Sequence, residues 1–138
     1  MGQKKLVRPL GKKRKKKLLG TDGPDELTGT KKKNRIYGFD GDDLIRTEEG
    51  KYKAWGGRGA DTFETLNGGK GFLKIMDFQA GDIVTFCGCL GTQLQQRGND
   101  TWVVKGDDVK AVVKGVSAED LTIDYDLAVI NVSTDPLA

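Results

Sequence analysis

The sequence contains no histidine, and its only two cysteines, Cys87 and Cys89, stand two residues apart. Without histidine the chain lacks the most common general base and every Ser-His or Cys-His pair. A disulfide between residues two apart would be strained, so we expect two half-buried thiols. Further soft ligands for a zinc site are missing nearby. We therefore predict that the protein is not an enzyme.

Long apolar runs are missing as well. No stretch approaches the ~18 residues that a membrane-spanning helix needs, and the basic N-terminal segment lacks the apolar run of a cleaved secretion signal. Proline is scarce, whereas glycine makes up 20 of 138 residues, roughly twice its usual share. This composition argues against collagen and proline-rich linkers, and it indicates many backbone positions with positive φ.

Positive charge is concentrated at the N-terminus. Residues 1–17 hold nine Lys or Arg and no acidic residue, and the remainder holds 14 basic and 20 acidic residues. A basic arm thus precedes an acidic body. Charge alone makes one set of residues candidates for binding nucleic acid, an anionic polysaccharide or a lipid surface, although a solvated tail and a solvated face are equally compatible with it. The set comprises Lys12, Lys13, Arg14, Lys15, Lys16, Lys17, Lys31, Lys32 and Lys33.

Three segments, residues 20–25, 38–43 and 56–61, share the pattern G-x-x-G-x-D and begin 18 residues apart. A frame of nine residues continues between them, because every block carries an apolar residue at its eighth place. These residues, which we expect to form the thin core of the repeat region, are Leu18, Leu27, Ile36, Ile45, Ala54, Phe63 and Phe72. A repeat with a fixed period is far more specific than a single short motif.

The block GGRGADTFE, residues 56–64, fits G-G-x-G-x-D-x-U-x, where U is apolar, and the repeats resemble the RTX, or haemolysin-type, calcium-binding family. The resemblance implies a parallel β-roll in which two nonapeptides complete one coil and consensus turns stack on one edge. We predict an all-β chain with a basic, disordered arm at 1–17, a short parallel β-roll of about three coils at 18–73, and an antiparallel β-rich C-terminal cap at 74–138.

Calcium prefers six to eight oxygen ligands, and glycine turns leave backbone carbonyls accessible. The resemblance implies that calcium binds between successive consensus turns, which gives about two sites with Asp43 serving both. Arg58 replaces the third-place aspartate of the other turns, and we expect it to point outward toward Asp40. The roll should need calcium to fold. The candidate metal-binding residues are Gly20, Asp22, Gly23, Asp25, Gly38, Asp40, Gly41, Asp43, Gly56, Gly57, Gly59 and Asp61.

The segment after the roll should cover its open end. We expect strands at 84–87, 101–105, 109–114 and 127–132, a short helical turn at 116–121, and a cap core of Phe78, Phe86 and Trp102. The next turn on the calcium edge would begin at Lys74 and lacks glycines, so a third full site is not expected. The calcium chemistry favours an exported, extracellular bacterial protein with a structural or adhesive role, secreted by a type I route without a cleaved signal. The alternative is anion or nucleic-acid binding through the basic arm, with the roll as scaffold.

Overall fold

The computed structural model describes residues 16–30, 33–65 and 71–133, and these fold almost entirely into β-strands. No helix in this part of the chain is long and apolar enough to cross a membrane. The seven-stranded sheet, called sheet A, contains, in spatial order, β1 (Lys16–Leu19), β3 (Lys33–Tyr37), β5 (Gly50–Trp55), β7 (Gly71–Ile75), β11 (Asp108–Val113), β10 (Asp100–Lys105) and β9 (Thr92–Arg97). The six-stranded sheet, called sheet B, contains β12 (Leu121–Asp124), β13 (Val129–Val132), β8 (Ile83–Thr85), β6 (Thr62–Glu64), β4 (Leu44–Thr47) and β2 (Glu26–Gly29).

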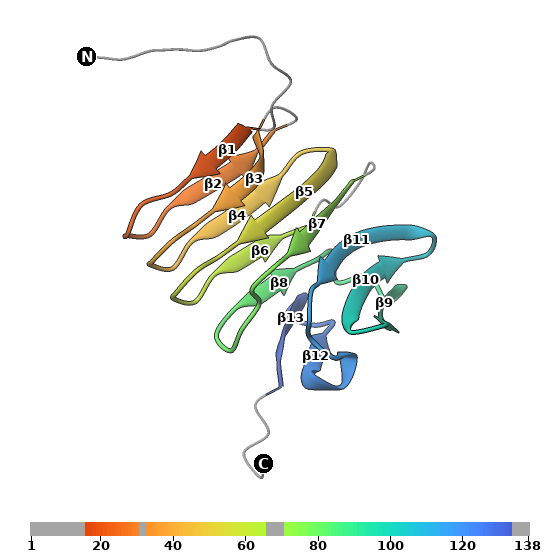
Figure 1. The fold of residues 1–138 in the computed structure, drawn as a ribbon. Coiled ribbons are helices and arrows are strands. Elements are labelled where there is room, and N and C mark those ends of the chain that lie inside the picture. The colour runs from red at the N-terminus through yellow and green to blue at the C-terminus, as the bar shows by residue number, and fades with distance from the viewer. Residues whose placement is uncertain (1–15, 31–32, 66–70, 134–138) are drawn as a thin grey trace, which may run out of the picture.

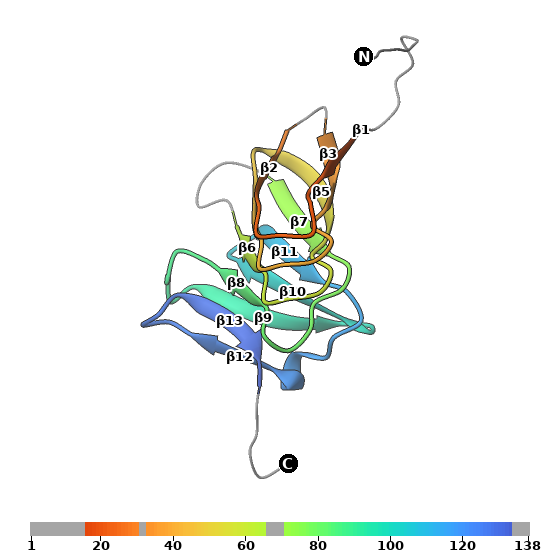
Figure 2. The ribbon, with the colours of Figure 1, turned by 90° about the vertical axis from the view of Figure 1, so that its left-hand side faces the viewer.

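The first eight strands alternate between the two sheets and form a parallel solenoid of about three turns (Figure 1). Strands of one sheet pair in parallel with a step of 18 residues, so that Leu27 lies beside Ile45 and Ile45 lies beside Phe63. Figure 2 shows the two sheets facing each other across the narrow interior of the coil. The predicted parallel β-roll is therefore confirmed.

The apolar eighth place of the repeat builds the core of the roll. Side chains alternate between the two faces of a strand, and the eighth-place residues from Leu27 to Phe63 all point inward and are buried. The frame fails at Phe72, where the expectation was wrong, because Leu73 and Ile75 are the buried residues of β7. The reason is that the third coil is longer: Tyr52 pairs with Leu73, a step of 21 residues.

The C-terminal segment covers the end of the roll with mainly antiparallel strands. β8 still pairs in parallel with β6, and β11 pairs in parallel with β7, whereas the pairs β9–β10, β10–β11, β12–β13 and β13–β8 are antiparallel. A 3₁₀ helix, η2 (Ala118–Asp120), stands where the helical turn was predicted. The predictions missed β9 and β12, which carry more polar residues.

Two predictions about the cap side chains were wrong. Phe78 and Phe86 are buried in the core, but Trp102 is only half-buried, with the Arg97 guanidinium 4.6 Å from its ring centre. Cys87 and Cys89 form a disulfide instead of free thiols. Gly88 lies between them with φ 77° and turns the chain so that their Cα atoms are 5.2 Å apart, within the usual range for a disulfide.

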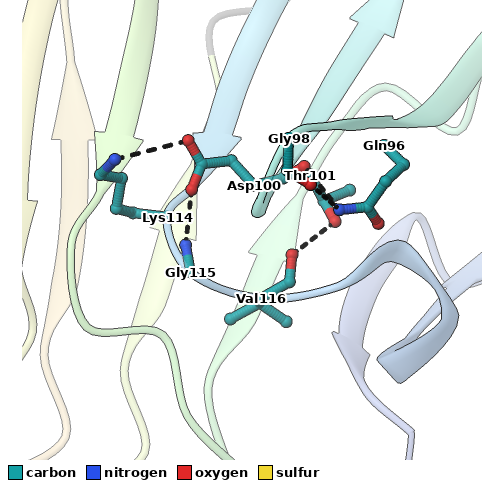
Figure 3. Close-up of polar contacts among 7 residues, drawn as sticks. All are labelled: Gln96, Gly98, Asp100, Thr101, Lys114, Gly115 and Val116. Atoms are coloured by element: carbon teal, nitrogen blue, oxygen red, sulfur yellow. Dashed lines mark hydrogen bonds and ion pairs between the residues drawn. The ribbon is translucent and has the colours of Figure 1, made fainter.

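Polar side chains fasten the cap strands to one another (Figure 3). The Asp100 carboxylate accepts the Gly115 N–H at 2.7 Å and lies 3.5 Å from the Lys114 ammonium, and the Thr101 hydroxyl donates to the Val116 carbonyl at 2.7 Å. The Gly115 N–H and the Val116 carbonyl lie just beyond β11, so these bonds tie the start of β10 to the end of its partner strand.

Candidate metal centre

Four turns lie in a row along one edge of the roll, at residues 20–25, 38–43, 56–61 and 76–82 (Figure 1). Main-chain hydrogen bonds fix their vertical alignment. The Gly20 N–H donates to the Tyr37 carbonyl, and the Gly38 N–H donates to the Trp55 carbonyl, both at 2.8 Å. The starts of successive turns are therefore stacked along the axis of the roll, with the N-terminal turn uppermost in Figure 1.

The sixth-place aspartates of these turns form a column. The Asp25 N–H donates to the Asp43 carboxylate at 2.9 Å, and the Asp43 N–H donates to the Asp61 carboxylate at 2.9 Å. The Asp61 N–H then donates to the Asp82 carboxylate at 2.8 Å. Asp43 and Asp61 therefore each accept a hydrogen bond from the turn above, while their own N–H groups donate to the carboxylate of the turn below.

These carboxylates are buried without full compensation. Asp43 is 2% exposed and Asp61 is 0% exposed, and the Oδ2 atom of each has no hydrogen-bond partner in the described structure. The pKa of Asp43 is raised to about 6 and the pKa of Asp61 to about 8, mainly by burial and in smaller part by the neighbouring carboxylates. A buried, unpaired anion is costly, so the column is suited to accept a cation.

Carbonyl oxygens of each turn face the turn below. The Gly23 carbonyl oxygen lies 2.6 Å from the point that a Cβ on Gly41 would occupy. A Cβ on Gly57 would overlap the Phe39 carbonyl, and a Cβ on Gly59 would overlap that of Gly41. Gly41, Gly57 and Gly59 also have positive φ values of 93°, 81° and 106°. Only glycine combines this backbone conformation with such a close approach.

Other carbonyls point in the opposite direction, toward the turn above. The Gly38 carbonyl oxygen lies 2.9 Å from the Cβ position of Gly20, and the Gly56 carbonyl oxygen lies 2.8 Å from that of Gly38. Each gap between consensus turns is therefore lined by carbonyl oxygens from both sides and by the aspartate column. This is the hard oxygen donor set that calcium prefers.

The remaining predicted ligands lie farther out. Asp22 and Asp40 are exposed, and the Arg58 guanidinium lies 4.0 Å from Asp40, as expected for an outward-pointing side chain. Asp42, which the sequence did not single out, accepts the Ala60 N–H at 2.8 Å and so braces two successive turns.

The fourth turn contains residues that the sequence analysis missed. It begins near Asp77 and not at Lys74, because the third coil is three residues longer than the others. The Asp77 carboxylate accepts the N–H groups of Gly56 and Gly57, both at 2.8 Å, and the Gln79 side-chain amide donates to the Gly57 carbonyl at 2.7 Å. The sequence signal that could have revealed this turn is the step of 21 residues from Asp61 to Asp82, in place of the usual 18.

The described residues contain no cluster of three acidic or sulfur side chains of the kind that forms a carboxylate-rich metal centre. The gaps between turns instead combine one column of carboxylates with main-chain carbonyls. Such a mixed set fits calcium, which readily takes backbone oxygens, and fits zinc poorly.

The candidate anion-binding residues fall largely outside the described structure. Lys12, Lys13, Arg14, Lys15, Lys31 and Lys32 are not described, and Lys16 and Lys33 are described only as strand residues. Lys17 is the exception, with its ammonium 5.8 Å from the centre of the Tyr37 ring.

The family comparison agrees with the geometry of the turns. The RTX calcium-binding nonapeptide repeat family matches residues 19–51 with four copies, which confirms the resemblance seen in the sequence. No curated protein matches the chain. The RTX repeat is a structural calcium-binding module with no catalytic role of its own, and it is typical of secreted proteins. Residues 19–51 of the solenoid therefore match RTX repeats, which imply calcium binding in a β-roll.

Proposed function

We propose that the chain binds two calcium ions, one in each gap between its three consensus turns. The observation that carries this proposal is the aspartate column, in which the Oδ2 atoms of Asp43 and Asp61 are buried and unpartnered and lie beside carbonyl-lined gaps. A divalent cation would neutralise these charges and supply the missing interaction.

The carbonyl directions suggest which residues would serve each site. The upper gap, between turns 20–25 and 38–43, offers the carbonyls of Gly23 and Gly38 together with the carboxylates of Asp25 and Asp43. The lower gap, between turns 38–43 and 56–61, offers another set: the carbonyls of Phe39, Gly41 and Gly56 and the carboxylates of Asp43 and Asp61. Asp43 is common to both, and the exposed Asp22 and Asp40 could contribute through water.

The gap below turn 56–61 differs from the other two. There the Gly57 carbonyl already accepts a hydrogen bond from Gln79, and Asp77 already accepts two main-chain N–H groups. Protein hydrogen bonds thus replace the contacts that an ion would make, which supports two ions in place of three. The fourth turn closes the column.

Calcium binding at this site would be coupled to folding, because ionised aspartates stacked at strand spacing of ~4.8 Å repel one another. Extracellular calcium modules bind at about 10⁻⁴–10⁻³ M, an affinity that is useful where calcium is abundant. We therefore propose a structural or adhesive role outside the cell for this chain, after export by a type I route.

Isothermal titration with calcium tests the proposal. We expect two ions per chain for the unmodified protein, and a loss of binding at both sites in Asp43→Asn, because both gaps share this residue. Asp107→Asn, an exposed aspartate in the turn between β10 and β11, is the matched control and should retain both ions. No binding by the unmodified protein, or unchanged binding by Asp43→Asn, would rule the assignment out.

A further inference from the structure

The outer face of sheet A carries a column of positive charge. Strand register places Lys17 beside Arg35, Arg35 beside Lys53, and Lys53 beside Lys74. Within the described residues, none of these four side chains has a carboxylate oxygen within 4.0 Å. Like charges directly opposite one another destabilise a sheet, so this basic column is a repulsive arrangement that the described chain leaves uncompensated.

The outer face of sheet B shows that the same fold can avoid this repulsion. There Arg46 lies between two glutamates, with its guanidinium 3.7 Å from Glu26 and 3.0 Å from Glu64. Charges of opposite sign alternate along that face. The repeat therefore does not impose like charges on its outer columns, and the basic column is a property of the residues on sheet A.

The middle of the basic column has a polar atom that lacks a partner. The Nε atom of Arg35 is buried and makes no hydrogen bond in the described structure. Beside it lies an open hollow of about 220 Å³, whose lining includes Arg35, Lys51, Lys53, Phe72 and Lys74. An anionic group entering this hollow would meet several cations and an unused donor, and Arg is well suited to bind a carboxylate through two parallel hydrogen bonds.

The neighbouring column on the same face is aromatic. The rings of Tyr37 and Trp55 stack with their centres 4.6 Å apart and their planes 3° apart, and Lys17 lies over the Tyr37 ring. Phe39 also stacks with Tyr37 at 6.4 Å. Single-stranded nucleic acids bind by stacking bases on free ring faces, and here the rings are already engaged with one another. The aromatic column stiffens the face but offers little surface for bases.

We propose that the outer face of sheet A binds a linear acidic polysaccharide, with successive carboxylates along the basic column of Lys17, Arg35, Lys53 and Lys74. Strand spacing places these cations at intervals of ~4.8 Å, close to the length of one pyranose ring in an extended chain, and each sugar acid carries one carboxylate. This face lies on a broad side of the roll, away from the aspartate column on the turn edge (Figure 2). The proposal therefore does not require the polysaccharide to share ligands with calcium.

The test is the binding of a short oligogalacturonate to the full chain at one fixed calcium concentration and several concentrations of sodium chloride. Arg35→Gln/Lys53→Gln removes two cations from the basic column. Arg46→Gln/Lys105→Gln removes one Arg and one Lys elsewhere, from sheet B and from β10. We expect the first variant to bind about twenty-five-fold more weakly, about fivefold for each contact between unit charges near 4 Å in water. Its salt slope should fall by about one for each cation removed, and the control should bind like the unmodified chain.

Three results would overturn the proposal: no binding by the unmodified chain, an equal loss in both variants, or tighter binding of a single-stranded DNA oligonucleotide of equal charge. A second readout uses the protein alone. In low salt, Arg35→Gln/Lys53→Gln should melt at a higher temperature than the unmodified chain and Arg46→Gln/Lys105→Gln at a lower one, and both differences should shrink in high salt. A lower melting temperature for the first variant in low salt would contradict the uncompensated repulsion on which the proposal rests.

Discussion

Replacing Asp61 with asparagine should stabilise the protein without calcium and remove part of the stability that calcium adds. Asp61 is fully buried; one carboxylate oxygen accepts the Asp43 N–H and the other has no partner in the described structure. Asparagine keeps the first acceptor and removes the charge. The column of hydrogen bonds can therefore persist while the electrostatic character of the gap changes.

The magnitudes follow from the environment of this carboxylate. Burial raises its pKa from 3.8 to about 8, so that keeping it in the fold at about pH 7 costs about 4 kcal/mol. The new amide places a buried donor where the carboxylate oxygen lacked a partner, at a cost of about 1–3 kcal/mol. The calcium-free variant should thus gain about 1–3 kcal/mol. A site filled at 100 times its dissociation constant contributes about 2.7 kcal/mol. The variant should lack this contribution, so that in excess calcium it should be at most about 1.7 kcal/mol less stable than the unmodified chain.

Urea unfolding followed by circular dichroism, with chelator and with excess calcium, measures both changes. Asp107→Asn is the control, because its carboxylate is exposed and its substitution should change neither condition. The reasoning about this carboxylate would be refuted by an Asp61→Asn protein that is less stable than the unmodified chain without calcium, yet gains as much stability from calcium as the unmodified chain does.

Three further predictions concern the turn edge. Without calcium, the buried turn aspartates have pKa values raised from the ordinary 3.8 to between about 6 and about 8. Their contribution to stability is therefore greatest near or below pH 3.8 and is lost as the pH rises through the raised pKa values. The urea midpoint measured in chelator should fall between about pH 5 and 8, and a midpoint that does not fall would contradict this prediction. Asp77→Ala removes the acceptor of two main-chain N–H groups and should lower the free energy of unfolding in urea by about 3 kcal/mol. Calorimetry should still count two calcium ions, and a changed ion count would show that this turn holds metal. Gly57→Ala should be far more destabilising than Gly98→Ala in thermal unfolding, because both glycines have positive φ but only Gly57 faces a carbonyl where the Cβ would stand; equal losses, each of about 1–2 kcal/mol, would remove the close-approach argument.

The sequence allowed the roll to be predicted because its turns have strict local requirements. Glycine is needed where Gly41, Gly57 and Gly59 approach the carbonyls of the turn above, and aspartate is needed where its carboxylate bonds to that turn. These requirements recur every 18 residues, so the consensus turns and the buried eighth-place residues stand out. Phe39 shows the tolerance of the pattern, since it occupies the place of a consensus glycine with φ 65°.

The closing turn could not be predicted because side chains there replace the function of the glycine backbone. Asp77 and Gln79 bind the exposed polar groups of turn 56–61, and no repeat pattern marks such residues. The three additional residues of the third coil also shifted the frame, which led to the wrong assignment of Phe72 to the core. The cap was predicted in outline from its apolar runs, but Trp102 was misplaced because a single aromatic residue does not indicate which face of its strand is covered.

The most direct test of the calcium assignment is anomalous X-ray diffraction from crystals grown with calcium. The account predicts two anomalous peaks in a line along the turn edge, one between turns 20–25 and 38–43 and one between turns 38–43 and 56–61, with none between turns 56–61 and 76–82. Peaks located away from the carboxylates of Asp25, Asp43 and Asp61, or an ordered roll whose gaps hold no anomalous scatterer in saturating calcium, would contradict it.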